Sequence, residues 1–335
     1  MSTGVASRLQ GTGQHLVARV AALRGSDARS VLKRVALPMI GLLVMLMLWE
    51  QGAKQVQTSL GALPGPVAVW EQAGNLWDEH RAERAKAAAF YQRQDKRNAE
   101  KLAKNPEAEI RIRSYTGKPT FVDQIKTSLV TVMSGFLLAS LIAIPAGLAI
   151  GLSPTLYAMF NPVIQLFKPV SPLAWLPIVT LVVSAVYVSD DPMISKSYLV
   201  SMLCVMLCSI WPTLVNTAVG ASTVSTDLVN VSRVLRLHAL SHVWRVVLPS
   251  AIPMIFAGLR TSLGVAWMVL IASEMLAQNP GLGKFVWDEF QNGSSASLGR
   301  IMVAVLTIGL IGFLLDRCML WLQRNVSWDK NAILR

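Results

Sequence analysis

The chain has 335 residues, of which 53% are hydrophobic and only 15% are charged, whereas soluble domains usually carry about 25% charged residues. Uncharged stretches long enough to cross a membrane run between Lys126 and Lys168, Lys168 and Asp190, and Lys196 and Asp227. This composition excludes a soluble enzyme, a disordered chain and a fibrous repeat. A net charge of +12 would point to nucleic acid on a soluble protein. Membrane proteins, however, gather lysine and arginine in their cytoplasmic segments, so we expect no nucleic-acid partner.

The N-terminal segment, residues 1–34, is basic and contains a single acidic residue, Asp27. Such a segment stays in the cytoplasm, and the helical spacing of its apolar residues favours a short helix on the membrane surface over a partner-binding arm. The apolar run Val35–Trp49 predicts the first transmembrane helix, within residues 35–50. No small-residue cleavage site follows this run, so we expect an uncleaved span.

Residues 51–125 form a polar loop that no membrane helix can cross. Its middle, from Trp77 to Arg113, is rich in good helix formers and predicts a solvent-exposed helix or hairpin. The loop is basic, but loops longer than about 60 residues translocate largely regardless of charge, so we expect it in the periplasm. Its basic part, residues 81–118, could gather anions or steer a binding protein by its charge; a solvated helix is the simpler interpretation.

Five further spans are predicted within a core domain, residues 126–323. They are the apolar runs Thr127–Leu152, Val163–Val188, Tyr198–Val219, Met254–Leu276 and Ile301–Leu322. The run Val163–Val188 contains three prolines, so it should be kinked or broken. The expected fold class is therefore an all-α integral membrane protein with six transmembrane helices.

The charges of the connecting loops agree with six spans. Loops 189–197 and 277–298 are neutral or acidic, whereas loop 220–253 and the tail 324–335 are basic. Basic loops stay in the cytoplasm. The sequence therefore predicts a multi-pass protein with both termini in the cytoplasm.

The stretch Ser225–Pro253 has the pattern of two short amphipathic helices joined by a turn. Thr226 can cap the first helix and Ser241 the second, and Pro249 should end the second. A cytoplasmic loop has no need to bury apolar residues. A loop with two apolar helical faces is therefore expected to dock on a partner.

At these residues the chain resembles the membrane subunits of ABC importers. Their cytoplasmic loop carries Glu-Ala-Ala, three residues, Gly, nine residues, Ile, one residue and Leu-Pro. Leu248-Pro249 matches the end of this signature, and Arg236 stands at its glycine position. The resemblance implies a type I permease-like fold, in which coupling loop 223–250 docks in a groove of the ATPase subunit. The residues expected to contact the ATPase are Asn230, Val231, Ser232, Arg233, Leu235, Arg236, Leu237, His238, Val246, Leu248 and Pro249.

Other stretches resemble the nitrate, bicarbonate, sulfonate and taurine branch of that family, among them Pro172–Ile178, Ala272–Met275 and Gly281–Gly283. The run Val234–Leu237, which replaces the usual glycine, is most similar to nitrate and nitrite permeases. The resemblance implies a bacterial inner-membrane importer subunit for a small oxyanion, nitrate or nitrite first, with bicarbonate, alkanesulfonate and taurine as alternatives. The implied partners are a second copy of the permease, two cytoplasmic ATPase subunits, a periplasmic or lipid-anchored solute-binding protein and membrane lipids.

The chain lacks a phosphate-cradling loop of the form G-x-x-x-x-G-K-[ST]. We therefore expect no enzymatic activity, no catalytic residue and no cofactor in this chain, with ATP and Mg bound by the partner ATPase subunits. An ion-coupled secondary transporter would need intramembrane relay residues and internal repeats, and a membrane hydrolase would need paired catalytic groups inside the spans. Neither pattern is evident.

Charged and aromatic residues inside the spans are candidates for a translocation pathway. They are Lys168, Trp175, Arg260 and Trp267. The alternative for the two cations is snorkelling to the inner interface, and for the two tryptophans it is packing. Glu274 would repel an anion and is better interpreted as a structural acceptor for loop 277–298. His238 and His242 lack a third ligand nearby in the sequence, so an interface or solvent role is favoured over a metal site.

Overall fold

A computed structural model describes residues 36–58, 61–105, 110, 112–188, 194–294 and 296–326. They belong to two compact units divided between Ala68 and Val69. The predicted segment 1–34, most of the tail 324–335 and the acidic part of loop 189–197 lie outside the described residues.

The first unit contains a helix over Ala36–Gln55, followed by the antiparallel pair β1 (Gln57–Thr58) and β2 (Gly61–Ala62). The predicted end of this span at Trp49 is too early. The helix continues because Glu50 and Lys54, four residues apart, form an ion pair at 3.1 Å on its surface. Its apolar side chains are largely exposed, as expected for a helix that faces lipid.

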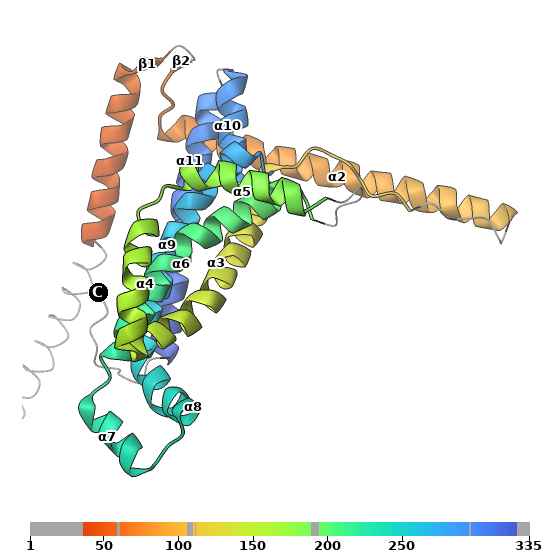
Figure 1. The fold of residues 1–335 in the computed structure, drawn as a ribbon. Coiled ribbons are helices and arrows are strands. Elements are labelled where there is room, and N and C mark those ends of the chain that lie inside the picture. The colour runs from red at the N-terminus through yellow and green to blue at the C-terminus, as the bar shows by residue number, and fades with distance from the viewer. Residues whose placement is uncertain are drawn as a thin grey trace, which may run out of the picture. The chain divides into compact units, whose positions relative to one another are not determined.

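In the second unit, the predicted polar helix is α2, which spans Pro66–Lys104. It begins before the predicted Trp77, and its proximal half is fastened to the ends of the spans. Arg300 donates two hydrogen bonds to the Glu79 carboxylate, at 2.9 and 2.7 Å, and Arg84 pairs with Asp123. Figure 1 shows α2 running across the helical bundle and continuing past it.

The bundle is built from α3 (Phe121–Leu152), α6 (Lys196–Ser222), α9 (Leu248–Ala277) and α11 (Ser297–Val326). α6 packs most extensively against α3 and α9. At Gly147 of α3 an added Cβ would lie only 2.7 Å from the Leu214 carbonyl oxygen of α6, so glycine is what permits this close approach. Each helix is longer than its predicted span. Polar caps extend two of them: Thr120 and Asp123 form a capping box in α3, and Ser195 caps α6.

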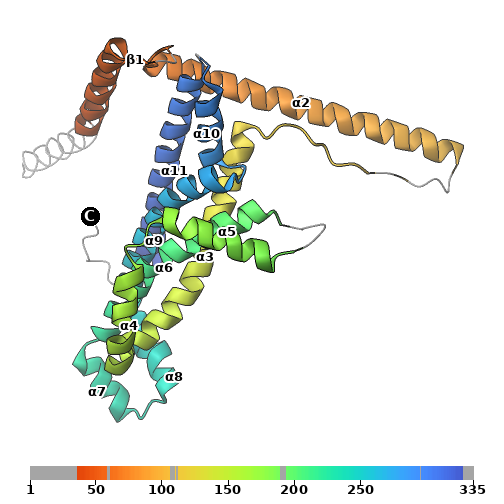
Figure 2. The same ribbon diagram turned by 45° about the horizontal axis from the view of Figure 1, so that its top comes forward.

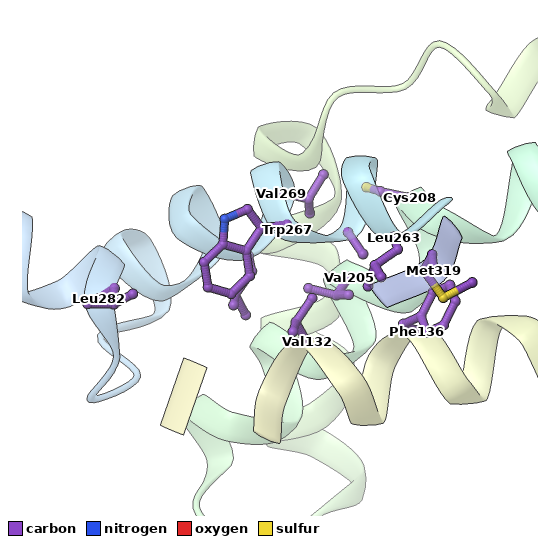
Figure 3. Packing of buried hydrophobic residues seen from close by; sticks show 11 residues of the cluster. Val132, Phe136, Val205, Cys208, Leu263, Trp267, Val269, Leu282 and Met319 are labelled. Carbon is purple, nitrogen blue, oxygen red and sulfur yellow. The ribbon is translucent and has the colours of Figure 1, made fainter. Parts of the chain in front are cut away.

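The centre of the bundle is an apolar cluster with contributions from α3, α6, α9, α10 (Leu282–Asn292) and α11. Figure 3 shows Val132 and Phe136 of α3 with Val205 of α6 and Leu263 and Trp267 of α9. These residues are 0–6% exposed. The cluster holds the spans against one another.

The predicted span Val163–Val188 is broken, as its prolines indicate. It consists of α4 (Pro154–Phe167) and α5 (Pro172–Val186), bent by 99°. The predicted start at Val163 is wrong, because Ser153 caps α4 and Pro154 occupies its first turn. Among the described residues, five helices are long and apolar enough to cross a membrane, or six if α4 and α5 count as one span. The all-α, multi-span fold class is confirmed.

Candidate functional site

The loop predicted to couple with a partner lies between α6 and α9. It contains α7 (Thr226–Val234), α8 (Ala239–His242) and a π-helical turn over Val243–Val247. Figures 1 and 2 show α7 and α8 at one end of the bundle and α10 at the other end. The loop is therefore a separate layer across the ends of the spans.

The predicted caps and the predicted stop are wrong in detail. Ser225 and His238 take the N-cap positions, in place of Thr226 and Ser241. Pro249 does not end the second helix, which passes through the π-helical turn directly into α9. The Leu248 N–H reaches the Val243 carbonyl, five residues back, and this wider turn accommodates the proline that follows. Movement of α8 would therefore be transmitted to α9 along a continuous helix.

One contact fastens the two halves of the loop to each other. His242 Nδ1 lies 2.8 Å from Ser232 Oγ, and Ser232 is only 5% exposed. Val247, on the π-helical turn, is fully buried. Ser232 thus stabilises the loop from inside and is not available to a partner as predicted, while His242 has a structural role that its spacing from His238 did not reveal.

The turn after α7 keeps a backbone conformation that normally requires glycine. Arg236 has φ +48°, and it occupies the glycine position of the resembled signature. The Leu237 N–H bonds the Ser232 carbonyl at 3.1 Å, and the Arg236 N–H bonds the Arg233 carbonyl at 3.0 Å. This is the Schellman pattern of a helix end. Arginine maintains the shape of the turn at a cost of about 1 kcal/mol.

Replacing Arg236 with glycine should therefore stabilise the loop by about 0.5–1 kcal/mol, because glycine adopts a positive φ without strain. Hydrogen exchange of the Leu237 amide in the purified chain measures this as slower exchange. Arg233→Gly is the matched control, since it removes the same charge from a residue inside α7, where glycine should destabilise the helix by about 1 kcal/mol. Equal effects of the two variants would contradict the assignment of strain to Arg236.

Large apolar side chains are exposed on the outer surface of the loop. They include Val231 at 54%, Val234 at 82%, Leu235 at 63%, Leu240 at 72% and Trp244 at 64%. An exposed apolar patch of this kind marks a protein or membrane contact. The predicted contact residues did not include Val234, Leu240 and Trp244, because these positions are not part of the resembled signature. Their helical spacing was the signal that could have identified them.

The other predicted contact residues differ in accessibility. Those that are exposed are Asn230, Arg233, Arg236, His238 and Pro249, and those that are half-buried are Leu237, Val246 and Leu248. Leu237 lies in the turn after α7, Val246 in the π-helical turn and Leu248 at the start of α9. They support the loop from behind, so the accessible surface is formed mainly by α7, α8 and Trp244.

The four candidate pathway residues do not converge on one cavity. Arg260 and Trp267 line a cavity of about 200 Å³ together with Asp316. Trp175 packs against the central apolar cluster, and Lys168 is exposed at the break between α4 and α5. The pathway assignment stays a prediction for all four.

Asp316 is the partner of Arg260 that sequence reasoning missed. Arg260 of α9 donates to both carboxylate oxygens of Asp316 on α11, with Nη2 at 3.0 Å from Oδ2. The neighbouring Arg317 lies farther away, 3.7 Å from Oδ2. Trp267 also joins the same two helices, because its Nε1 donates to the Ile308 carbonyl at 2.9 Å. These contacts give Arg260 and Trp267 a structural role in holding α9 to α11.

Exchanging the charges in the double variant Arg260→Asp/Asp316→Arg distinguishes a structural role of Arg260 from a role in the translocation pathway. If the pair is structural, the single variants should each lose about 2–4 kcal/mol, because each leaves a partly buried charge without its partner, and the double variant should recover both thermal stability and transport. The measurements are thermal unfolding of the purified chain and uptake in vesicles. Recovery of stability without recovery of transport would instead place Arg260 in the pathway.

Comparison with known proteins agrees with this architecture. Residues 135–328 match the family described as binding-protein-dependent transport system inner membrane component. The fold is similar to a chain of the MetNI methionine ABC transporter in inward-facing conformations. That similarity has a TM-score of 0.53 and 13% identity, and covers 62% of this chain and 96% of that chain.

Three curated proteins illustrate the range of relatives. The nitrate import permease protein NrtB of Synechococcus elongatus is 38% identical over 204 residues, 61% of this chain and 69% of that protein. The bicarbonate transport system permease protein CmpB of the same species is 32% identical over 299 residues, 88% of this chain and 91% of that protein. The taurine transport system permease protein TauC of Escherichia coli is 30% identical over 208 residues, 62% of this chain and 70% of that protein.

Proposed function

Because this chain belongs to the family of binding-protein-dependent transport system inner membrane components, we propose that it is the translocation subunit of an ATP-driven importer for a small anion. The observation that carries this proposal is the loop between α6 and α9. Its exposed apolar surface on α7 and α8 is rigidly connected to α9 through the π-helical turn. Such a surface suits a separate motor protein, whose movement would tilt α9 and open the bundle alternately to the two sides.

The assembly that we propose contains two copies of the permease, two ATPase subunits and a solute-binding protein. The ATPases bind ATP and Mg and contact the coupling loop in the cytoplasm. The solute-binding protein, periplasmic or lipid-anchored, delivers the anion to the opposite end of the bundle. Both termini of the permease lie in the cytoplasm of a bacterial cell, and the chain itself performs no covalent chemistry.

Nitrate or nitrite is the substrate that we propose first. Its support is the 38% identity to a nitrate import permease, together with the Val234–Leu237 run at the coupling turn. Bicarbonate is the second candidate, because the similarity to a bicarbonate permease extends over 88% of this chain, including much of the region before α3. Alkanesulfonate and taurine are further alternatives, and an ion-coupled secondary transporter is the alternative of a different class.

Uptake by proteoliposomes that contain the permease, its ATPases and its binding protein tests the proposal. We expect uptake of labelled nitrate that requires ATP and is inhibited by vanadate. Competition with unlabelled nitrite, bicarbonate and taurine ranks the substrates, and stronger competition by bicarbonate than by nitrite would favour the second candidate. Uptake driven by an ion gradient without the ATPases would contradict an importer of this class.

A further inference from the structure

The distal half of α2 carries a basic groove that the proposed importer function does not use. The cations of this groove are Arg93, Arg97, Lys101 and Arg113, and together with Phe90, Gln94 and Asn98 they line a cavity of about 490 Å³. Among the described residues, no acidic side chain lines the groove. Four cations without a counter-charge are expected to attract an anionic surface.

The groove faces the same way as the part of α2 that touches the bundle. Residues seven apart lie on the same face of a helix, because two turns take about 7.2 residues. Glu79 and Lys86 line a cavity of about 350 Å³ against Gln124 of α3 and Phe285 of α10. Arg93 continues the row of Glu79 and Lys86 at this spacing. The basic groove therefore opens toward the level at which the spans end.

The neighbourhood of the groove is also apolar. Ile112, next to Arg113, is 83% exposed, Ile110 is 45% exposed, and Leu102 of α2 is 37% exposed. Leu102 lies on α2, whereas Ile110 and Ile112 lie in the segment that follows it. Basic residues beside exposed aliphatic ones are typical of segments that lie in the interface of an anionic bilayer. Since the spans must end at the headgroups and α2 extends past the bundle at that end (Figures 1 and 2), we expect the headgroup layer to be the surface nearest its distal half.

We propose that the groove of α2 binds the headgroups of anionic phospholipids at the membrane surface beside the bundle. The proximal half of the same helix is held to α3 and α11 by the Arg84–Asp123 and Arg300–Glu79 pairs. Lipid composition at this surface is therefore coupled to the ends of two spans.

Headgroup quenching in nanodiscs tests this proposal on the full chain. The variant Cys318→Ser removes the exposed native thiol of the described residues, and Asn98→Cys then places a fluorophore in the groove. Quenching by spin-labelled headgroups is compared in phosphatidylcholine discs with and without roughly 30% phosphatidylglycerol, at low and high salt. We expect stronger quenching in the anionic discs and its loss at high salt, because exposed charges are screened.

The double variant Arg97→Gln/Lys101→Gln should weaken binding of the groove to anionic headgroups roughly twenty-five-fold, since each cation near an anionic surface contributes a factor of about five. Quenching in the anionic discs should fall toward the phosphatidylcholine level. The matched control is Arg81→Gln/Lys96→Gln, which removes the same charge from α2 outside the groove and should retain quenching. The exchange variant Arg97→Lys/Lys101→Arg keeps both charges and should also retain quenching.

Three results would overturn the proposal. They are equal quenching in both kinds of disc, an equal loss of quenching in the control variant, and shielding of the label only by added solute-binding protein or a second permease copy.

Discussion

Replacing Leu235 with aspartate is expected to detach the ATPase subunits and abolish ATP-driven uptake. Leu235 is 63% exposed in the turn after α7, beside Val231 and Val234, so the substitution leaves the spans untouched. In the proposed complex, however, this side chain is buried against the ATPase, where an unpaired carboxylate is strongly unfavourable. We expect a loss of about 2 kcal/mol or more of binding free energy, roughly a thirtyfold increase in Kd.

Co-purification of the permease with tagged ATPase subunits measures this loss. Leu235→Met keeps an apolar side chain of similar volume and should retain at least most of the binding. Arg236→Glu should also weaken the complex, because it reverses a charge at the same exposed turn. If Leu235→Asp co-purifies as well as the natural chain and elutes as the same folded species, the loop is not the docking surface.

Glu274 is the residue at which we expect a second large effect, a loss of stability. This residue near the end of α9 is fully buried, and its carboxylate accepts from Ser128 Oγ at 2.8 Å and from the Gly283 N–H at 3.0 Å. Ser128 Oγ in turn accepts from the Leu282 N–H at 2.8 Å. The carboxylate thus joins α9, α3 and the start of α10, which confirms that Glu274 is a structural acceptor for loop 277–298.

The variant Glu274→Met fills a similar volume but accepts no strong hydrogen bond. Ser128 and Gly283 would each keep a buried donor without a partner, at about 1–3 kcal/mol each. We expect a total loss of about 3 kcal/mol, which lowers the midpoint of thermal unfolding by roughly 4 °C for a chain of this size. Tryptophan fluorescence of the purified chain follows the transition.

Two further variants test whether the loss of stability comes from the buried carboxylate of Glu274. Glu274→Gln retains one acceptor oxygen and should lose less stability than Glu274→Met. Asp288→Asn removes a carboxylate from α10, where Asp288 pairs with Lys284 at 3.1 Å near the surface, and should cost less than about 1 kcal/mol. If Glu274→Met unfolds no earlier than Asp288→Asn, the buried carboxylate does not hold this end of the bundle.

Much of the fold followed from the sequence because it depends on local pattern. The lack of charge between Lys126 and Lys168 and between Lys196 and Asp227 can only be accommodated by helices in lipid, so the spans were predictable, as was the break near Pro169 and Pro172. The helix ends were less predictable. They depend on caps such as Thr120 and Ser153, and Pro249 was misinterpreted as a stop because a π-helical turn has no clear sequence signature.

The candidate site was also predictable only in part. That residues 223–250 form two amphipathic helices was visible in their periodicity, and the resemblance to a signature identified the turn at Arg236. Which residues of this loop are accessible was not visible, since Ser232 is buried where His242, ten residues later, folds back onto it. The pairing of Arg260 with Asp316, 56 residues apart, could not be found by examining each span alone.

The sequence by itself determined the class of the protein: an all-α membrane chain with a basic insertion and an amphipathic loop between its fourth and fifth spans. These properties follow from how many apolar residues stand in a row, and every residue contributes to them independently. Only the tertiary structure decided which polar groups inside the spans are paired and in which direction the groove of α2 opens. Such features depend on the relative rotation of helices about their axes, which distant packing contacts such as those of Gly147 and Trp267 determine.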